Sequence, residues 1–253
     1  MNLDFTGKKV LVTGASSGIG YAAALGFAQS GADVAVTYNE NKPGADDLAS
    51  KARALGRKCI VVKVNVVHEK EVEAMFDAVL KEFGGRLDVL VNNAGTIVKR
   101  VPIAECSTEI WDQIIDLNLR SVFFCCRRVA KVMEAQKSGR IINVTSIAAR
   151  NGGGVGATPY ACSKGAVSTF TRGFAREMAP HKVTVNAVAP GIIDTPFHQK
   201  HTPRPLWEKQ IAPIPLGPGK TEDVTGAFLF LASDAAHYIT GEVIEVNGGL
   251  LMD

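Results

Sequence analysis

The sequence predicts one α/β domain, a doubly wound parallel sheet of seven strands with helices on both faces. Short strand-like runs alternate with helical stretches along the whole chain. The strand-like runs are almost continuously apolar, which is typical of parallel strands that are buried on both faces. The 253 residues contain no repeat or linker that would divide them. We therefore expect residues 1–253 to form a single domain.

The first half of the chain supplies four strands and three helices. The run KKVLVTG predicts a buried strand ending near Thr13, and a helix follows from about Gly18 to Ser30. DVAVTY is the second strand, and ADDLASKARAL is a helix that Gly56 stops. KCIVVKV is the third strand, followed by the helix EKEVEAMFDAVLKEF. The fourth strand, LDVLVNNAG, ends in polar and small residues.

The second half supplies three more strands around an irregular region. A long helix is expected from about Thr108 to Gln136, then the strand RIINVTS and a helix that carries Tyr160. KVTVNAVAPG and EVIEVNGG are the sixth and seventh strands. Residues 191–221 contain six prolines, so they predict a long connection with short helical pieces. Connections of this length in a compact domain are often binding loops, and we expect a substrate loop here.

Composition excludes several classes of partner. The formal charge is only +3 and there is no Lys/Arg block, so we expect no nucleic-acid partner. No apolar run is long enough for a membrane span, and the start does not resemble a signal peptide. The five cysteines form no C-x-x-C pair, and the histidines have no metal-ligand spacing. These features predict a cytoplasmic protein with reduced thiols, no metal and a small-molecule substrate.

Two loops at strand ends are candidate ligand sites. In TGASSGIG, Gly14, Gly18 and Gly20 lie between the first strand and the first helix, where glycines let the backbone approach a pyrophosphate. The lysine of a nucleotide-triphosphatase loop is absent. NNAG, residues 92–95, ends the fourth strand. Its asparagines either rigidify the loop or contact a cofactor.

Four polar side chains are candidate catalytic residues. Tyr160 and Lys164 are four residues apart, so they share one helix face. A nearby ammonium favours the ionised phenol, which suits acid/base chemistry near neutral pH. The alternative is an amphipathic contact on a surface helix. Ser146 ends the fifth strand, where it can face the same crevice, and Asn118 stands in the middle of the long helix although asparagine is not a strong helix former.

The motifs TGASSGIG, NNAG, NVTS, YACSK and NAVAPG, in this order, resemble the short-chain dehydrogenase/reductase family over essentially the whole chain. The resemblance implies a Rossmann-like fold, a nicotinamide cofactor and a homo-oligomer, usually a tetramer. It also implies that Tyr160 is the general acid and base, that Lys164 binds the nicotinamide ribose and lowers the pKa of Tyr160, that Ser146 holds the substrate oxygen, and that Asn118 positions a water.

The same resemblance implies a cofactor site. Its residues are Gly14, Ser16, Ser17, Gly18, Ile19, Gly20, Tyr38, Asn39, Asn65, Val66, Asn92, Ala94, Gly95, Tyr160, Lys164, Pro190, Gly191, Ile193 and Thr195. Asn65 stands where the family usually has an aspartate beside the adenine. Tyr38 stands where NAD-preferring members often have an acid for the ribose hydroxyls, which favours NADP(H) over NAD(H). Glu40 is nearby and no arginine is placed for a 2′-phosphate.

Three functions remain open, and they differ in substrate. The first is an oxidoreductase that interconverts a carbonyl and a secondary alcohol on a small polar substrate, such as a sugar or keto-sugar acid. SIAARNGGGVGATPY and PGIIDTPFHQKHT resemble reductases of sugar-derived keto acids, and a carboxylate clamp would come from Arg100, Arg150, His198 and Arg204. The second is a 3-oxoacyl-carrier-protein reductase, with Arg127, Arg128 and Lys131 as a dock; the alternative for these three residues is a solvated face or a subunit interface. The third is a dinucleotide-binding sensor without turnover.

Overall fold

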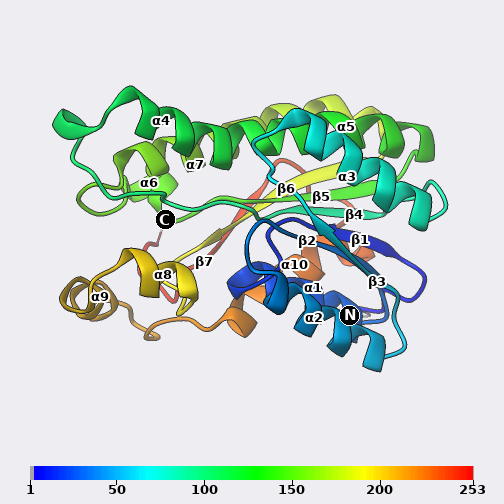
Figure 1. The fold of residues 1–253 in the computed structure, drawn as a ribbon, viewed down its shortest axis with the longest axis horizontal. Helices are drawn as coiled ribbons and strands as arrows, with labels where there is room; N and C mark the ends of the chain where they lie inside the picture. Colours follow the sequence, from blue (N-terminus) through cyan, green and yellow to red (C-terminus); the bar gives the residue numbers. More distant parts are fainter. Residues whose placement is uncertain (1–2, 253) are drawn as a thin grey trace.

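A seven-stranded parallel sheet forms the centre of the computed structural model, which describes residues 3–252 (Figure 1). The strand order is β3-β2-β1-β4-β5-β6-β7. This arrangement confirms the predicted doubly wound α/β fold. The strands are β1 (Lys9–Val12), β2 (Asp33–Tyr38), β3 (Cys59–Lys63), β4 (Val89–Asn92), β5 (Gly139–Val144), β6 (Val183–Pro190) and β7 (Val243–Val246).

Helices cover both faces of the sheet and enclose two apolar cores. One layer holds α1 (Gly18–Gln29), α2 (Lys42–Ala54) and α10 (Thr221–Ala232), and the other holds α3 (Glu69–Glu82), α4 (Thr108–Ile115), α5 (Ser121–Gln136) and α7 (Thr158–Met178) (Figure 1). The short helices are η1 (Ile103–Glu105), α6 (Ala148–Asn151), η3 (Ala179–His181), α8 (Pro196–His201), α9 (Arg204–Ile211) and η4 (Asp234–Ala236).

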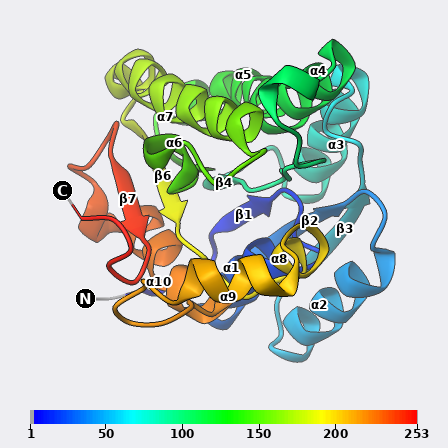
Figure 2. The ribbon, with the colours of Figure 1, turned by 90° about the vertical axis from the view of Figure 1, so that its left-hand side faces the viewer.

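The topology creates a crevice at the carboxyl edge of the sheet. The chain starts in the middle with β1, builds outward to β2 and β3, and then returns to add β4 to β7 on the other side of β1. The connections after β1 and β4 therefore diverge, and a ligand can enter between them. Figure 2 views this edge, with α6 and α7 on one side and α8 and α9 on the other.

The long helix expected from about Thr108 to Gln136 is interrupted, which corrects the sequence prediction. A π-helical turn, η2 (Asp116–Arg120), separates α4 from α5. Asn118 lies in this turn, and its side-chain Nδ2 donates to the backbone oxygen of Ile114 at 2.9 Å. A side chain that competes for a carbonyl one turn back disturbs the regular hydrogen-bond ladder. Such π-turns are frequent at functional sites.

The sequence of α10 has no amphipathic pattern, because its apolar residues lie on all sides of the helix and do not form one stripe. The structure explains this composition. Val224, Phe228 and Leu231 are buried, and α10 packs closely on α1. A Cβ atom on Gly26 of α1 would lie 2.5 Å from Thr225 Cγ2, so only glycine permits this approach. Among the described residues, no helix has the length and apolarity that crossing a membrane requires.

Candidate active site

A cavity of about 870 Å³ opens at the carboxyl edge of the sheet. It is lined by the turn after β1, by the ends of β2 to β6 and by α8. The predicted cofactor residues that line it are Gly14, Ser16, Ser17, Gly18, Ile19, Tyr38, Asn39, Asn65, Val66, Ala94, Gly95, Tyr160, Lys164, Pro190, Gly191, Ile193 and Thr195. The sequence motifs thus converge on one cleft, which we call the active-site cleft.

The turn after β1 has the geometry of an anion cradle. Gly14 and Gly18 have φ angles of 63° and 58°, in the left-handed region that favours glycine. A Cβ atom on Gly14 would lie 2.9 Å from Ala94 Cα. At the start of α1 the N-cap residue Ser17 makes no side-chain cap hydrogen bond. The first N–H groups of α1 are therefore left for a ligand, and this end of the cleft fits a dinucleotide pyrophosphate.

Two predicted cofactor residues, Gly20 and Asn92, do not line the cleft. Asn92 is buried in the core, where its Nδ2 donates to Asn143 Oδ1 at 2.9 Å. A Cβ atom on Gly20 would lie 2.2 Å from the side chain of Asn93. Asn93 in turn donates to the backbone oxygens of Thr13 and Gly14, each at 2.9 Å. These residues hold the glycine turn against the loop after β4, and Asn93 has the rigidifying role that is one of the two alternatives for the asparagines of NNAG.

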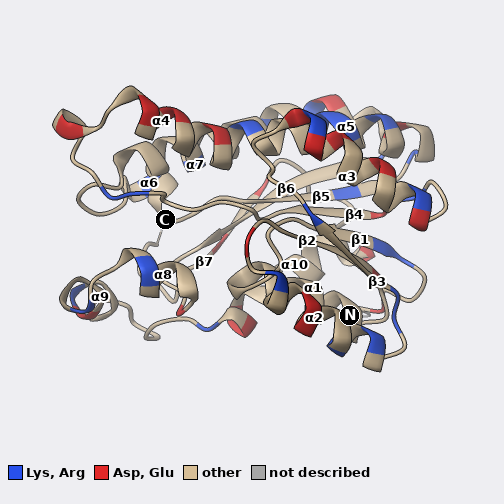
Figure 3. Cartoon of the chain, viewed as in Figure 1, with Lys and Arg blue, Asp and Glu red and all other residues tan. Residues whose placement is uncertain are grey.

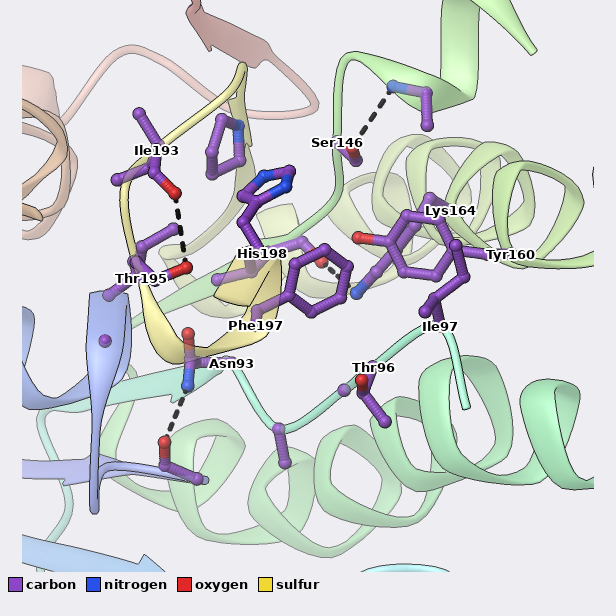
Figure 4. A pocket seen from close by; sticks show the side chains of 18 of the residues that line it. Asn93, Thr96, Ile97, Ser146, Tyr160, Lys164, Ile193, Thr195, Phe197 and His198 are labelled. Carbon is purple, nitrogen blue, oxygen red and sulfur yellow. Dashed lines mark hydrogen bonds between the residues drawn. The ribbon is translucent and has the colours of Figure 1, made fainter. Parts of the chain in front are cut away.

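The four predicted catalytic residues converge at the other end of the cleft. Ser146, Tyr160 and Lys164 line it (Figure 4). Lys164 is only 3% exposed, its Nζ donates to the backbone oxygen of Val144 at 2.8 Å, and it lies 5.8 Å from the centroid of the Tyr160 ring. The tyrosine and the lysine come from one face of α7, as their spacing predicts, and Ser146 reaches them from the end of β5.

Asn118 lies directly behind Lys164. A Cβ atom placed on Gly95 would be 2.5 Å from Asn118 Oδ1 and 3.2 Å from Lys164 Nζ, so both polar ends approach the same point. Asn118 Nδ2 donates to the backbone oxygens of Thr96 and Ile114, at 2.8 and 2.9 Å. Its Oδ1 is buried and has no hydrogen-bond partner among the described residues. That oxygen is an acceptor held ready beside the ammonium.

The protonation states of the pair differ from the sequence prediction. Burial raises the pKa of Tyr160 to about 12, against smaller lowering effects of the Ser146 hydroxyl and Arg100. Burial also lowers the pKa of Lys164 to about 8. In the chain itself, burial is the largest influence on both groups, so the predicted lowering of the Tyr160 pKa is not seen. The phenol is held protonated, as a proton donor must be.

A short lid crosses the catalytic end of the cleft. Phe197 of α8 places its ring centroid 6.0 Å from that of Tyr160, and Figure 4 shows the two rings as neighbours. At the end of α8, His201 Nε2 lies 3.0 Å from Thr96 Oγ1. The lid is thereby fastened to the loop after β4. The helix therefore lies beside the catalytic tyrosine and forms part of the cleft wall.

The predicted carboxylate clamp is only partly assembled. Arg100 and His198 line the cleft, whereas Arg150 and Arg204 do not. Arg150 Nη1 contacts Glu245 Oε1 at 3.0 Å, and Arg204 Nε contacts Glu208 Oε1 at 2.7 Å, so both are engaged elsewhere. Burial, with help from the charge of Arg100, lowers the pKa of His198 to about 4, so this histidine is neutral at pH 7. Arg100 is the predicted cation that the structure brings to the cleft.

The arginines considered as a carrier-protein dock are paired with acids of α3. Arg127 contacts Glu69, and Arg128 contacts Glu73 and Asp77 at 2.9 and 2.7 Å. Figure 3 shows the two signs of charge interspersed over α3 and α5. This pairing neutralises the face, and it favours the alternative interpretation of a solvated surface over an open basic dock.

Comparison with known proteins places this geometry in a family. The family profile described as Enoyl-(Acyl carrier protein) reductase matches residues 14–251. The chain is 43% identical to a 3-oxoacyl-[acyl-carrier-protein] reductase of Synechocystis sp. over 249 residues, which cover 98% of each chain. This relative favours the acyl-carrier alternative over the keto-sugar acid that we expected first.

Solved structures agree with the observed fold. A structure from Sinorhizobium meliloti described as a short-chain alcohol dehydrogenase has a TM-score of 0.92 at 34% identity, covering 99% of this chain and 98% of that one. A structure from Agrobacterium tumefaciens described as a gluconate dehydrogenase has a TM-score of 0.93 at 32% identity, covering 100% and 99%. The fold, the cleft and these matches agree: the chain belongs to the short-chain dehydrogenase/reductase family and is an oxidoreductase that acts on CH–OH donors.

Proposed function

We propose that this oxidoreductase reduces the 3-oxo group of an acyl thioester to a 3-hydroxy group, using NADP(H) in preference to NAD(H). Members of the family use NAD(P)H. The observation that carries the proposal is the 43% identity, over 98% of each chain, to a protein named as a 3-oxoacyl-[acyl-carrier-protein] reductase. Fold alone would not select a substrate, so the lining of the cleft has to agree with it.

The lining of the cleft supports an acyl substrate. Apolar side chains contributed by four separate segments are part of it: Ile97, Ile147, Phe197, Pro213, Leu250 and Leu251. A hydrocarbon chain gains free energy when such side chains remove it from water. A sugar would need hydroxyl-binding partners at these positions. The prolines of residues 191–221 suggest a polar loop, but this loop presents Phe197 and Pro213 to the cleft.

The chain's own groups perform the proton chemistry. NAD(P)H supplies the hydride when it is bound. Tyr160 donates its phenolic proton to the substrate carbonyl oxygen, and the Ser146 hydroxyl donates a second hydrogen bond to that oxygen. Lys164, fixed by the backbone oxygen of Val144, keeps a positive charge behind the phenol. Asn118 Oδ1, an acceptor without a partner among the described residues, would hold a water behind Lys164 through which a proton returns to the site.

A substrate panel tests the proposal. Oxidation of NADPH is followed with a 3-oxobutanoyl thioester of N-acetylcysteamine, a keto-sugar acid, a neutral ketose and a diketone. We expect the thioester to give the largest kcat/KM. A kcat/KM for the keto-sugar acid that is at least tenfold larger would overturn the proposal and restore the substrate class that the sequence first indicated.

Two features of the adenosine end of the cleft support NADP(H). It has no acidic residue at the end of β2, and it has side chains that can form hydrogen bonds to a phosphate. Tyr38 ends β2 where an acidic residue would bind the ribose hydroxyls. Ser16, Ser17 and Asn39 line the same end and offer hydrogen bonds to a phosphate. Glu40 also lines it and opposes this preference by its charge. The preference for NADP(H) therefore requires that hydrogen bonds from these neutral donors outweigh the repulsion between a 2′-phosphate and the exposed Glu40 carboxylate.

Replacing Glu40 with Gln is expected to raise kcat/KM for NADPH about two- to fivefold, because removal of an exposed charge contact is worth about 0.5–1 kcal/mol. The kcat/KM for NADH should change by less than about twofold. Both cofactors are measured at saturating substrate and low salt, where the charge effect is largest. Glu105→Gln, an exposed acid in η1, serves as the matched control. An equal gain for both cofactors would show that Glu40 does not face the 2′-phosphate.

We also propose a homo-oligomer, a tetramer as the family resemblance implies. Large apolar side chains are exposed on α4 and α5 at Trp111 and Phe123, and near the carboxyl end at Tyr238 and Met252. Apolar groups of this size on a surface support contacts with another chain. Light scattering after size exclusion should give four times the chain mass of 26.9 kDa. A mass of one chain would refute the oligomer.

A further inference from the structure

The guanidinium of Arg100 is a half-buried charge without a carboxylate partner in the active-site cleft. It lines the cleft, and no Asp or Glu of residues 3–252 lies within ion-pair distance of it. Burial lowers the pKa of Arg100, which reports lost hydration of the cation. A buried charge is costly unless it is paired, and arginine cannot escape this cost by losing its proton. An anion in the cleft would supply the missing partner.

Two carbonyl oxygens hold Arg100 in place. Its Nε donates to the backbone oxygen of His201 at 2.9 Å, and its Nη1 donates to the backbone oxygen of Val155 at 3.4 Å. The side chain thus spans from the end of the lid helix α8 to the loop before α7. These bonds use only part of its five N–H donors, so the guanidinium is oriented and keeps donors for a ligand.

A second polar group lies beside the guanidinium. A Cβ atom on Gly154 would be 3.2 Å from Gln210 Nε2 and 3.6 Å from Arg100 Nη1, so both side chains approach the same glycine. Gln210 also lines the cleft, and its Nε2, which is the donor end of the amide, is the end nearest to this glycine. Arginine and glutamine side by side provide several N–H donors of the kind that bind carboxylates.

The charges that line the cleft around this point are positive or neutral, and the nearby carboxylate of Asp194, which acts on His198, does not line it. Lys200 of the lid adds a second, exposed cation to the cleft lining. His198 is neutral at pH 7, because burial lowers its pKa to about 4. Arg100 and Tyr160 line the same cleft, and the charge of Arg100 slightly lowers the pKa of the phenol. An anionic group of the substrate would therefore be bound in the cleft that also holds its carbonyl.

We propose that the cleft also takes free oxo acids, with the substrate carboxylate on Arg100 and Gln210 and the oxo group facing Tyr160 and Ser146. The oxo carbon gains a hydride from NAD(P)H, the oxo oxygen gains the proton of Tyr160, and the carboxylate is unchanged. This second substrate class goes beyond thioester reduction and rests on the proton-donor role proposed for Tyr160. In a 3-oxo acid the carboxylate occupies the place that the thioester carbonyl has in a 3-oxoacyl thioester.

The experiment compares three substrates that share one oxo group and differ at the neighbouring acyl carbon. Acetoacetate carries a carboxylate, methyl acetoacetate is its neutral ester, and the N-acetylcysteamine thioester represents the proposed main substrate. NADPH oxidation is measured for wild type, Arg100→Gln and Arg100→Lys. Lys99→Gln removes a charge from the exposed neighbour, which does not line the cleft, and serves as the matched control.

Wild type should reduce acetoacetate, and Arg100→Gln should lower its kcat/KM about 10- to 100-fold, the range expected for lost hydrogen bonds to a charged group. The same variant should change kcat/KM for the methyl ester less than about threefold. Arg100→Lys should restore part of the activity with acetoacetate. Lys99→Gln should resemble wild type with all three substrates.

Two results would overturn the inference. An equal loss of kcat/KM on all three substrates would show that Arg100 only holds the end of α8 in place. Thioester reduction without acetoacetate reduction would limit the cleft to thioesters, and the proposed function would stand alone. Acetoacetate reduction that depends on Arg100, without thioester reduction, would retain the inference and remove the proposed function. The thioester and acetoacetate arms therefore separate the two failures.

Discussion

Replacement of Tyr160 with Phe is expected to lower kcat for carbonyl reduction about 10³-fold, while the dissociation constant of NADPH changes less than about threefold. The substitution removes one hydroxyl and keeps the ring that packs against Phe197 and lies beside Lys164. General acid catalysis by a positioned side chain contributes about 10²–10⁴-fold. No other group in the described chain combines a protonated hydroxyl with this position next to Ser146.

The measurement is a steady-state rate with saturating substrate, together with NADPH binding followed by fluorescence. Tyr21→Phe removes the same hydroxyl from a side chain that contacts Asp47 and Lys51 and does not line the cleft, and we expect its kcat to stay within about twofold of wild type. Retention of a tenth or more of the wild-type kcat by Tyr160→Phe would exclude the phenol as the proton donor. A dinucleotide-binding sensor without turnover would be indifferent to the change.

Replacement of Lys164 with Met is expected to have opposite effects on activity and on stability. Activity should fall at least about 10²-fold, because the charge behind the phenol is lost. The free energy of unfolding at pH 7 should rise by about 2 kcal/mol. The lowering of the Lys164 pKa from 10.5 to about 8 represents about 3 kcal/mol of burial cost, and loss of the hydrogen bond to Val144 offsets about 1 kcal/mol.

The pH dependence of this stability difference has a fixed sign. Between about pH 8 and 10.5 the unfolded chain holds the Lys164 proton while the folded chain has lost it, so wild-type stability rises with pH. The advantage of Lys164→Met is therefore complete below about pH 8 and disappears toward pH 10.5. Urea unfolding at pH 7 and pH 10 measures it. A Lys164→Met variant that is less stable than wild type at pH 7 would show that burial of the Lys164 ammonium does not destabilise the folded state.

The strand ends explain why much of the site can be predicted from the sequence. Parallel strands that follow one another bring their carboxyl ends to one edge, so Gly14, Gly95 and Ser146 meet although they are far apart in the chain. The four-residue spacing of Tyr160 and Lys164 fixes their common face in the same way. These inferences need only the period of an element and the direction of its strand.

The period of an element and the direction of its strand do not predict which side chains from distant segments will pair. Arg150 and Arg204 read as candidate clamps, but Arg150 contacts Glu245, which is 95 positions further along the chain. Arg204 instead pairs one turn ahead with Glu208. The period of a helix is consistent with the Arg204 pair, whereas neither that period nor the order of strands says that Arg150 will contact Glu245. Arg100 differs because the loop after β4 carries it into the cleft whatever its partners are.

Desolvation also depends on the assembled structure. The sequence places an ammonium beside a phenol and predicts attraction, which lowers the pKa of the phenol. Whether burial exceeds that attraction depends on the groups that surround Tyr160, including the side chain of Phe197 from a lid 37 positions away. The π-helical turn at Asn118 is hidden for a similar reason, because the side chain that bonds to Ile114 one turn back is also held by Thr96 of the loop after β4.

The number of residues in the π-helical turn η2 determines the direction in which the side chains after it point. Each residue of an α-helix advances the rotation by about 100°, so the extra residue of a π-turn rotates everything beyond it by that angle. Removing one residue between Asp116 and Arg120 would swing Val122 and Cys126 of α5 out of the core while Ile114 of α4 stayed in it. An insertion or deletion here should therefore be tolerated less well than a change of side chain. The spacing of this segment is as much a part of the active site as Asn118 itself.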